Sequence, residues 1–343
     1  MAIVAPFSFG CSSEETPEKR RVTEQDKPNI IFILADDMRY DDLQHMPKTQ
    51  DLIVEEGIEY EKAFVTTPLC CPSRASILRG QYTHNHEVWE NARGFPTFRR
   101  LGHERSTIAT WLGEEGYETA LLGKYLNAYN QEDLRHVPPG WDQWRAMLEE
   151  ASYYDYALSE NGEPARYGSA EADYSTDVLA GQAREIIRSS AAKDKPLFMY
   201  LAPSSPHGPG PPAPRHEGLF GDAQAQRPPS FDEADVSDKP GWVRNLPPLG
   251  AARKTYIEDV YRGHLGLLPS LDDLVEGVVE ELESEGELEN TYIFFSSDNG
   301  LLMGEHRIPD GKAPPTRSRS GCPWPCGGRA YPPAGPPSRW RST

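Results

Sequence analysis

The sequence is poor in cysteine and in basic residues, and it contains no long hydrophobic run. Its 343 residues include five cysteines, an odd number without the spacing of a disulfide framework or a zinc site. No segment reaches the length of about 18 consecutive apolar residues that a membrane helix requires, so we expect no transmembrane segment. The 35 Lys and Arg residues against 53 Asp and Glu residues give a net charge of −18. This acidic balance argues against nucleic acid as a partner and against docking on anionic membranes.

Residues 1–26 predict a leader or linker that precedes the folded domain. A short apolar run ends in a small residue and Cys11, and a polar stretch follows. This pattern is similar to the end of a bacterial lipoprotein signal, although the basic n-region is missing. A disordered amino terminus explains it about as well.

Buried strands alternate with helices through the middle of the chain. The predicted strands are 29–34, 117–122, 196–201 and 292–297, and the predicted helices lie around 107–115, 175–189 and 254–285. This alternation predicts an α/β fold with a mainly parallel central sheet flanked by helices. Residues 203–248 are rich in proline and predict a long surface loop that forms a substrate rim.

Polar side chains follow the first and the last of these strands. Asp36 and Asp37 come after the first strand, and Asp298 and Asn299 come after the last. In open α/β sheets the carboxyl ends of the strands bind ligands, and oxygen donors suit Ca²⁺ or Mg²⁺ better than zinc. Either motif alone is more often an ordinary strand-end turn. Their occurrence after two matching strands favours a divalent metal site.

Two adjacent cysteines, Cys70 and Cys71, precede a helical stretch, S-R-A-S-I-L-R. Neighbouring residues do not normally allow the Cα separation of a disulfide. We expect Cys70 to lie just before the helix, where the helix dipole and Arg74 lower its pKa and make the thiol reactive. The alternative is a buried structural cysteine, which we prefer for Cys71.

The stretch C-C-P-S-R-A-S-I-L-R-G matches the pattern C-x-P-S-R-x-x-x-L-x-G, and with it the chain resembles the sulfatase family. K-P-N-I-I-F-I-L-A-D-D resembles the first metal strand of that family, G-Y-E-T-A-L-L-G-K-Y-L-N its lysine segment, and S-S-D-N-G-L-L-M-G-E-H-R its second metal strand. Y-T-H-N-H-E-V-W-E-N and K-Y-L-N look closest to N-acetylglucosamine-6-sulfatase-like members. The resemblance covers residues 27–312, which we take as the catalytic domain, and it implies an alkaline-phosphatase-like fold.

The resemblance also implies a nucleophile and a metal site. A maturation enzyme would oxidise Cys70 to formylglycine, whose hydrated aldehyde attacks the sulfur of the sulfate. Position 70 would then share a Ca²⁺ or Mg²⁺ ion with Asp36, Asp37, Asp298 and Asn299, and this ion stabilises charge on the nucleophile and the sulfate.

Four further residues take roles from the same resemblance. Arg74 would orient the nucleophile, Lys124 and Lys312 would neutralise sulfate oxygens, and His207 would protonate the leaving oxygen. Taken singly, such a lysine or histidine is usually a solvated surface residue, and only the ordered set supports these roles. Many sulfatases have histidine two residues after the first catalytic lysine, where this chain has Leu126. The base for sulfate release therefore stays unassigned.

Residues 313–343 do not resemble the family. They are dominated by Pro, Gly, Arg and Ser and lack apolar periodicity. If residues 316–332 are written in G/C-rich codons and translated from one nucleotide earlier, they can spell Y-E-E-P-V-R-V-P-L-A-V-R-G-P-G-V-P, which resembles the missing family sequence. Our hypothesis is a frameshift after Lys312 that truncates the domain and removes a smaller C-terminal subdomain. A disordered basic tail is the alternative.

Together these patterns predict a sulfuric ester hydrolase for sulfated carbohydrates or aryl sulfates. We expect it to act outside the cytoplasm, as a secreted, periplasmic or lipid-anchored protein, and to need a formylglycine-generating maturation enzyme as its partner. Two alternatives stay open. One is a phosphonate or phosphate monoester hydrolase of the same superfamily, and the other is an inactive, truncated surface protein that binds metal or glycan.

Overall fold

The computed structural model describes residues 27–60, 62–131, 133–148, 151–193, 195–312 and 325–326. The predicted leader, including Cys11, lies outside these residues. So does the predicted tail, apart from Pro325–Cys326.

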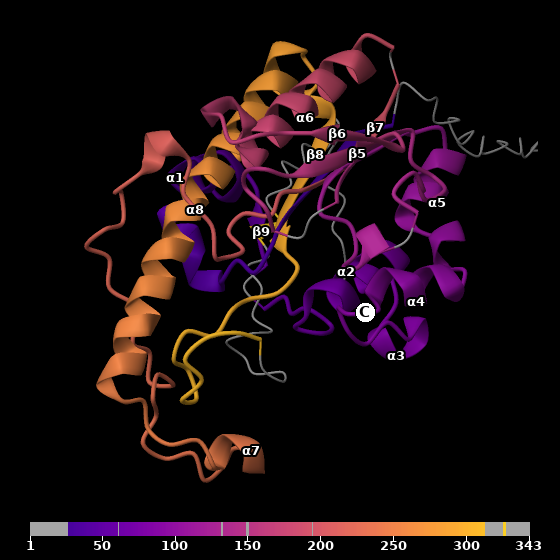
Figure 1. The fold of residues 1–343 in the computed structure, drawn as a ribbon. Helices are drawn as coiled ribbons and strands as arrows, with labels where there is room; N and C mark the ends of the chain where they lie inside the picture. The colour runs from indigo at the N-terminus through magenta and orange to yellow at the C-terminus, as the bar shows by residue number, and fades with distance from the viewer. Residues whose placement is uncertain are drawn as a thin grey trace, which may run out of the picture.

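A seven-stranded sheet forms the centre of the fold (Figure 1). Its strands are β1 (Asn29–Ala35), β3 (Glu118–Gly123), β4 (Gln143–Met147), β5 (Ala157–Glu160), β6 (Glu163–Arg166), β7 (Leu197–Ala202) and β8 (Thr291–Ser297). The order across the sheet is β6-β5-β4-β3-β7-β1-β8. Neighbours from β4 to β8 pair in parallel, whereas β5 and β6 are antiparallel additions at one edge. A separate antiparallel pair joins β2 (Ile58–Glu59) to β9 (Pro325–Cys326).

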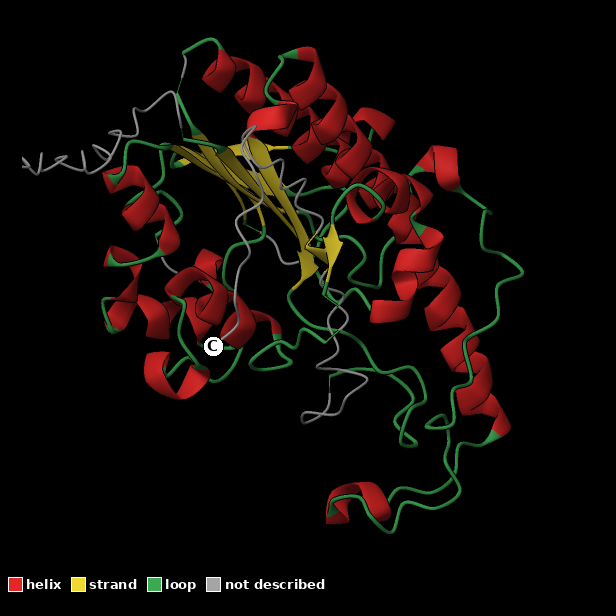
Figure 2. Cartoon of the chain, turned by 180° about the vertical axis from the view of Figure 1, so that it is seen from behind, coloured by secondary structure: helices red, strands yellow, loops and turns green. Residues whose placement is uncertain are grey.

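Helices cover both faces of the sheet. The α-helices are α1 (Pro47–Thr49), α2 (Cys70–Arg79), α3 (Thr83–His86), α4 (Gly94–Arg100), α5 (Ile108–Glu114), α6 (Ser175–Ala191), α7 (Gly241–Arg244) and α8 (Ala251–Ser284). Short 3₁₀ turns are η2 (Tyr40–His45), η4 (His103–Arg105), η5 (Tyr129–Gln131), η6 (Glu171–Asp173), η7 (Pro214–His216) and η8 (Leu288–Asn290), and η3 (Gln50–Val54) is a π-helical turn. Figure 2 shows the sheet between the group with α6 and α8 and the group with α2, α4 and α5.

Each face of the sheet buries a separate apolar core. On the side of α6 and α8, Ile33 and Leu201 from the strands share a core with Leu268 of α8. On the opposite side, Tyr200 of β7 shares a core with Phe95 of α4. Parallel strands buried on both faces read as continuous apolar runs, which is why the sequence predicts them.

The predicted α/β class with a mainly parallel sheet is confirmed, and each of the four predicted strands and three predicted helices is present. The sequence did not predict β4, β5 and β6, whose residues Q-W-R-A-M, A-L-S-E and E-P-A-R lack a clear apolar pattern. Residues 203–248 are largely irregular, as expected, with η7 and α7 as short exceptions. Among the described helices, none combines the length and the apolar character needed to cross a membrane.

Leu268→Ala should lower the free energy of unfolding by about 2–5 kcal/mol, because it leaves a cavity in the core between α8 and the sheet. Leu219→Ala is the matched control, since Leu219 is 61% exposed, and it should change the same quantity by less than about 0.5 kcal/mol. Urea denaturation followed by circular dichroism measures both. Equal losses in the two variants would contradict the packing of α8 described above.

Candidate active site

Parallel strands deliver polar side chains to one edge of the sheet. Asp36 and Asp37 follow β1, Lys124 follows β3, and Asp298 and Asn299 follow β8. The sheet order places β1 directly beside β8, so the two acidic motifs are neighbours although they are far apart in the sequence. All five side chains are buried.

The backbone at the strand ends is specialised for this arrangement. Asp37 has a φ of 67°, in the left-handed region that aspartate tolerates better than most residues, and its N–H donates to Oδ1 of Asp298 at 3.1 Å. Gly123 has a φ of 94°, and a Cβ at this position would lie 2.1 Å from the carbonyl oxygen of Ala202. A glycine is therefore required immediately before Lys124.

Cys70 reaches the same cluster from the first turn of α2. Its thiol is buried and lies 3.6 Å from Oδ1 of Asp36 and 3.7 Å from Oδ1 of Asp37. One ligand atom from each of Asp36, Asp37, Cys70 and Asp298 lies within 4.8 Å of the others. These four residues could therefore hold a single metal ion.

Asn299 adds a further oxygen donor. Its Nδ2 donates to Oδ1 of Asp37 at 2.6 Å, and its buried Oδ1 has no hydrogen-bond partner among the described residues. An unpaired buried carbonyl oxygen costs about 1–3 kcal/mol, which a bound cation would offset. Carboxylates together with an amide oxygen are the donors that Ca²⁺ and Mg²⁺ prefer. The residues present thus fit a hard divalent cation.

Two cations sit against these carboxylates inside the fold. Arg74 donates from Nε to Oδ2 of Asp298 at 2.8 Å and from Nη1 to the carbonyl oxygen of Lys124 at 2.8 Å. Its Nη2 lies 3.7 Å from Oδ1 of Asp36 and makes no hydrogen bond within the described chain. Lys124 donates from Nζ to Oδ2 of Asp36 at 2.6 Å. The two cations are thereby fixed relative to the carboxylates.

Lys312 and His207 approach from loops. Nζ of Lys312 lies 2.6 Å from Oδ1 of Asp37 and also contacts Sγ of Cys70. Nε2 of His207 lies 3.5 Å from Oδ2 of Asp37, and this side chain is 27% exposed. With these two residues, every side chain that the sequence singled out for the site lies in one cluster. We call it the carboxylate cluster, and its members are Asp36, Asp37, Cys70, Arg74, Lys124, His207, Asp298, Asn299 and Lys312.

The charges within the carboxylate cluster perturb one another. Burial alone would raise the pKa of Asp36, but Lys124 and His207 hold it well below its usual value. Burial and the neighbouring Asp36 carboxylate instead raise the pKa of Asp298. Three aspartates face three fixed cations, so a divalent ion would leave the cluster positively charged and suited to an anion.

The expected activation of Cys70 through a lowered pKa is wrong. Burial raises the pKa of this thiol well above its usual value, and the carboxylate of Asp298 raises it further. Cys70 also lies inside α2, as its first residue after the N-cap Leu69, and not before the helix. The dipole of α2 and Arg74 are outweighed because the thiol is buried among carboxylates.

Cys71 belongs to the apolar core on the side of α4, which confirms the prediction that it is a buried structural cysteine. It is fully buried in the same core as Phe95. Its Sγ would lie 2.1 Å from a Cβ added at Gly94, so the cysteine fills the space that this glycine leaves.

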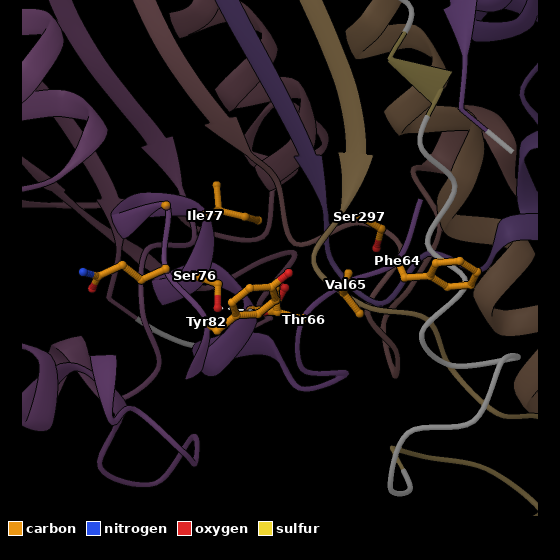
Figure 3. Close-up of a pocket in the computed structure, with 10 residues that line it drawn as sticks. Phe64, Val65, Thr66, Ser76, Ile77, Tyr82 and Ser297 are labelled. Carbon is orange, nitrogen blue, oxygen red and sulfur yellow. Dashed lines mark hydrogen bonds between the residues drawn. The ribbon is translucent and has the colours of Figure 1, made fainter. Parts of the chain in front are cut away.

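A pocket of about 330 Å³ lies between the segment before α2, α2 itself and Ser297 at the end of β8 (Figure 3). Inside it, Thr66 donates to Oγ of Ser76 at 2.7 Å, and Nε2 of His86 lies 3.0 Å from the same oxygen. Burial lowers the pKa of His86 to about 4, so this imidazole is neutral and serves the packing of the helix. None of the residues that line this pocket is a predicted catalytic residue.

A larger pocket of about 530 Å³ opens from the carboxylate cluster, and we call it the side pocket. Three residues of the cluster region, Asp37, His207 and Lys312, line part of it. The remaining wall comes from the loop after β7, from α8 and from the loop that ends at Lys312. The sequence predicts a substrate rim from residues 203–248, which include the loop after β7. It does not predict that α8 and the residues before Lys312 complete this wall, because these elements meet only in the folded chain.

Arg39 and Glu305 join the two loops that carry the metal-ligand candidates, and the sequence did not predict this contact. Nη2 of Arg39 lies 2.8 Å from Oε1 of Glu305, and its Nη1 donates to the carbonyl oxygen of Leu301 at 2.7 Å. The pair ties the loop after β1 to the loop after β8. A signal was present, since Glu305 lies inside the second metal-strand motif and Arg39 follows the first such motif by two residues.

Comparisons with known proteins identify relatives over most of the chain. The sequence model of the Sulfatase family matches residues 28–326. The chain is 37% identical over 295 residues to the extracellular sulfatase SULF-1 homolog of Drosophila melanogaster, which covers 84% of this chain and 26% of that protein. It is 36% identical over 294 residues to N-acetylglucosamine-6-sulfatase of Homo sapiens, and this alignment covers 82% of this chain and 53% of that protein. The chain thus spans between about a quarter and about half the length of these curated relatives.

Solved structures share the fold at lower identity. A protein solved in complex with its substrate D-glucosamine-2-N,6-O-disulfate has a TM-score of 0.70 and 22% identity, covering 87% of this chain and 70% of that chain. The phosphonate monoester hydrolase of Agrobacterium radiobacter has a TM-score of 0.63 and 20% identity. The superposition covers 87% of this chain and 67% of that chain. These similarities concern the arrangement of the sheet and its helices.

Ca²⁺ or Mg²⁺ should raise the melting temperature of this chain, because an ion that binds only the folded state at a hundredfold excess over Kd adds about 2.7 kcal/mol of stability. Asp298→Asn should remove most of this shift, since it deletes a ligand charge at the centre of the cluster. Asp222→Asn, which changes an exposed carboxylate, is the control and should retain it. Differential scanning calorimetry with each ion and with EDTA measures the shift, and a melting temperature insensitive to both ions would contradict the metal site.

Proposed function

The chain belongs to the sulfatase family, and we propose that it hydrolyses sulfate monoesters with Cys70, converted to formylglycine, at the nucleophilic position. The single observation that carries this proposal is the convergence of Cys70, three carboxylates and three cations at one edge of the sheet. A maturation enzyme that performs the conversion is the partner that this chemistry requires.

The metal in this proposal is Ca²⁺ or Mg²⁺, held by Asp36, Asp37, Asp298, Asn299 and position 70. Such an ion supplies positive charge to the sulfate and to the nucleophile. The close spacing of the ligand atoms and the unpaired Oδ1 of Asn299 support this assignment.

Two lysines hold the sulfate in this proposal. Burial alone would lower the pKa of Lys124 and of Lys312, but neighbouring carboxylates hold both above their usual value. Both ammonium groups therefore stay charged at neutral pH. Fixed cations beside position 70 favour the charge that develops on sulfate oxygens. Arg74 orients the nucleophile, because its hydrogen bonds to Asp298 and to the backbone lock the guanidinium in place.

His207 is the proposed proton donor to the leaving oxygen. It lies where the carboxylate cluster opens into the side pocket, so it can meet the oxygen that joins the sulfate to the rest of the substrate. Its carbonyl oxygen accepts a hydrogen bond from Tyr153 at 3.0 Å, which fixes the loop. Leu126 cannot act as a base, so we assign no residue to sulfate release.

The proposed substrates are sulfated sugars encountered outside the cytoplasm. The relative from Homo sapiens is named for N-acetylglucosamine 6-sulfate chemistry, and the relative from Drosophila melanogaster is named an extracellular sulfatase. We propose residues 27–312 as the catalytic domain, with the family match continuing past Lys312 to residue 326.

A phosphonate or phosphate monoester hydrolase is the second candidate. The fold shared with a phosphonate monoester hydrolase favours it, and a cluster of metal ligands and lysines would also suit a phosphonate. We place the sulfatase first because the curated relatives named as sulfatases are 36% and 37% identical to this chain, against 20% for that hydrolase.

Expression with the maturation enzyme should convert Cys70 to formylglycine and allow turnover of 4-nitrophenyl sulfate. Peptide mass spectrometry detects the conversion, and absorbance at the nitrophenolate band measures the turnover. Cys70→Ala should abolish turnover, because it removes the nucleophilic position. Cys71→Ala, one residue away in the core, is the control and should keep it.

Two outcomes of this experiment would change the assignment. Faster turnover of an aryl phosphonate than of the aryl sulfate would favour the second candidate. An unconverted thiol without turnover would count against catalysis and favour a chain that only binds metal or glycan.

His207→Ala should lower kcat for a sugar sulfate by about 10²–10⁴-fold, because a sugar alkoxide needs a proton in order to leave. The loss should be far smaller for 4-nitrophenyl sulfate, whose nitrophenolate leaves without protonation. His84→Ala removes an exposed histidine and should change neither rate. Steady-state kinetics on both substrates decide the matter, and an equal loss on both would show that His207 is not the proton donor.

A further inference from the structure

We propose that the side pocket binds the sugar ring that carries the sulfate and selects rings whose other substituents are uncharged or cationic. This inference rests on the proposed function, because it concerns the alcohol half of the same substrate. The residues that make the selection are Asp259 and Asp310, and Tyr256 and His264 line the pocket beside them.

The position of the side pocket follows from the residues that it shares with the carboxylate cluster. His207 and Lys312 line the pocket and also contact Asp37. A sulfate held by Lys312 and protonated by His207 at its bridging oxygen must direct its alcohol half into this space. The volume of about 530 Å³ lies in the range of ordinary small-molecule sites.

Small residues leave this space open. The wall includes Gly208, Pro209, Gly210, Gly263 and Gly311. Because glycines carry no side chain, no side chain projects into the pocket from these positions of the loop after β7 and of α8. A sugar ring can lie against such a wall and present its substituents to the polar groups around it.

His264 of α8 supplies a buried polar group to the pocket. Its side chain is 2% exposed, and its Nε2 lies 2.7 Å from Oδ2 of Asp42. The other ring nitrogen, Nδ1, makes no hydrogen bond within the described chain. With Nε2–H donating to Asp42, Nδ1 is an acceptor in the neutral ring and a donor in the charged ring. Because Nδ1 is itself buried, His264 forms part of the pocket wall and is held there by Asp42.

Besides Asp37, which is paired with Lys312, two carboxylates line the pocket. Asp310 accepts a hydrogen bond from Oη of Tyr256 at 2.7 Å, and it forms no ion pair in the part of the chain that the structure describes. Asp259 lies 2.5 Å from a guanidinium nitrogen of Arg262, which neutralises part of its charge. Asp310 therefore carries the larger uncompensated charge in the side pocket.

The two ends of the side pocket thus carry opposite charges. Lys312 provides positive charge at the end next to the carboxylate cluster, and Asp310 provides negative charge on the wall of the side pocket. A second sulfate on the same ring would face Asp310 and be repelled, whereas a free amine would be attracted. The substrate in the solved neighbour described above carries sulfate on both the 2-nitrogen and the 6-oxygen, so the same ring with one or two sulfates is the appropriate probe.

The test compares three 6-sulfated sugars: glucosamine, N-acetylglucosamine and N-sulfoglucosamine 6-sulfate. With the full chain after conversion of Cys70, kcat/KM should fall in that order, with steps of about 5- to 10-fold for one charge acting through a partly screened medium. Asp310→Asn should reduce the ratio between the first and the third sugar by about fivefold, since it removes one charge and keeps the shape. Asp222→Asn is the matched control and should leave the ratio unchanged. Tyr256→Phe, which keeps both carboxylates, should preserve the order of the three sugars.

The outcomes separate this inference from the proposed function. Equal kcat/KM for the three sugars, or an unchanged ratio in Asp310→Asn, would overturn the side-pocket selection while leaving a sulfatase. If the converted chain hydrolyses no sulfate, isothermal titration calorimetry with the same three sugars decides. The predicted order of affinities would then support the pocket although the proposed function fails, and an absence of binding would overturn both.

Discussion

Three buried aspartates lie at one edge of the sheet, and the rest of this structure must compensate their negative charge. Charges taken out of water are strongly destabilising unless opposite charges and hydrogen bonds compensate them. Here the compensation comes from three separate elements, with Arg74 on α2, Lys124 after β3 and Lys312 near the end of the described domain. Folding therefore brings the helix, the sheet and the loop that contains Lys312 to one point. The same contacts that make the aspartates tolerable also assemble the candidate active site.

The balance of charge explains why the cluster suits an anion only once a cation is bound. Without an ion, the fixed ammonium and guanidinium groups are matched by carboxylates, and Nζ of Lys312 is occupied by Asp37. A divalent ion bound to the carboxylates would weaken their ion pairs with the lysines, and the ammonium groups would then be free to bind an incoming sulfate. Burial and the nearby carboxylates also raise the pKa of the Cys70 thiol, and a thiol that stays protonated is a poor nucleophile. The proposed conversion of Cys70 to an aldehyde hydrate would avoid the need for a thiolate.

The sequence predicts the site better than it predicts the surroundings of the site. Strand-end motifs such as Asp36-Asp37 are local, and buried parallel strands carry them to a shared edge, so their meeting can be foreseen. The pKa of Cys70 could not, because it depends on burial and on Asp298, more than two hundred residues away. The side pocket depends on α8 packing against the loop before Lys312, and nothing local marks His264 or Asp310. The strands β4 to β6 were missed because they are short and lack apolar alternation. The frameshift after Lys312 stays a prediction that sequencing of the gene tests.

The central claim is that the carboxylate cluster becomes an anion site when it holds a divalent cation. The most direct measurement is the affinity of the purified chain for inorganic sulfate, determined by isothermal titration calorimetry with saturating Ca²⁺ and again with EDTA. We expect the ion to tighten sulfate binding by about tenfold or more, because a nearby divalent charge contributes at least 1–2 kcal/mol even in a partly screened site. Sulfate binding of equal strength under both conditions, or none under either, would contradict this account of the site.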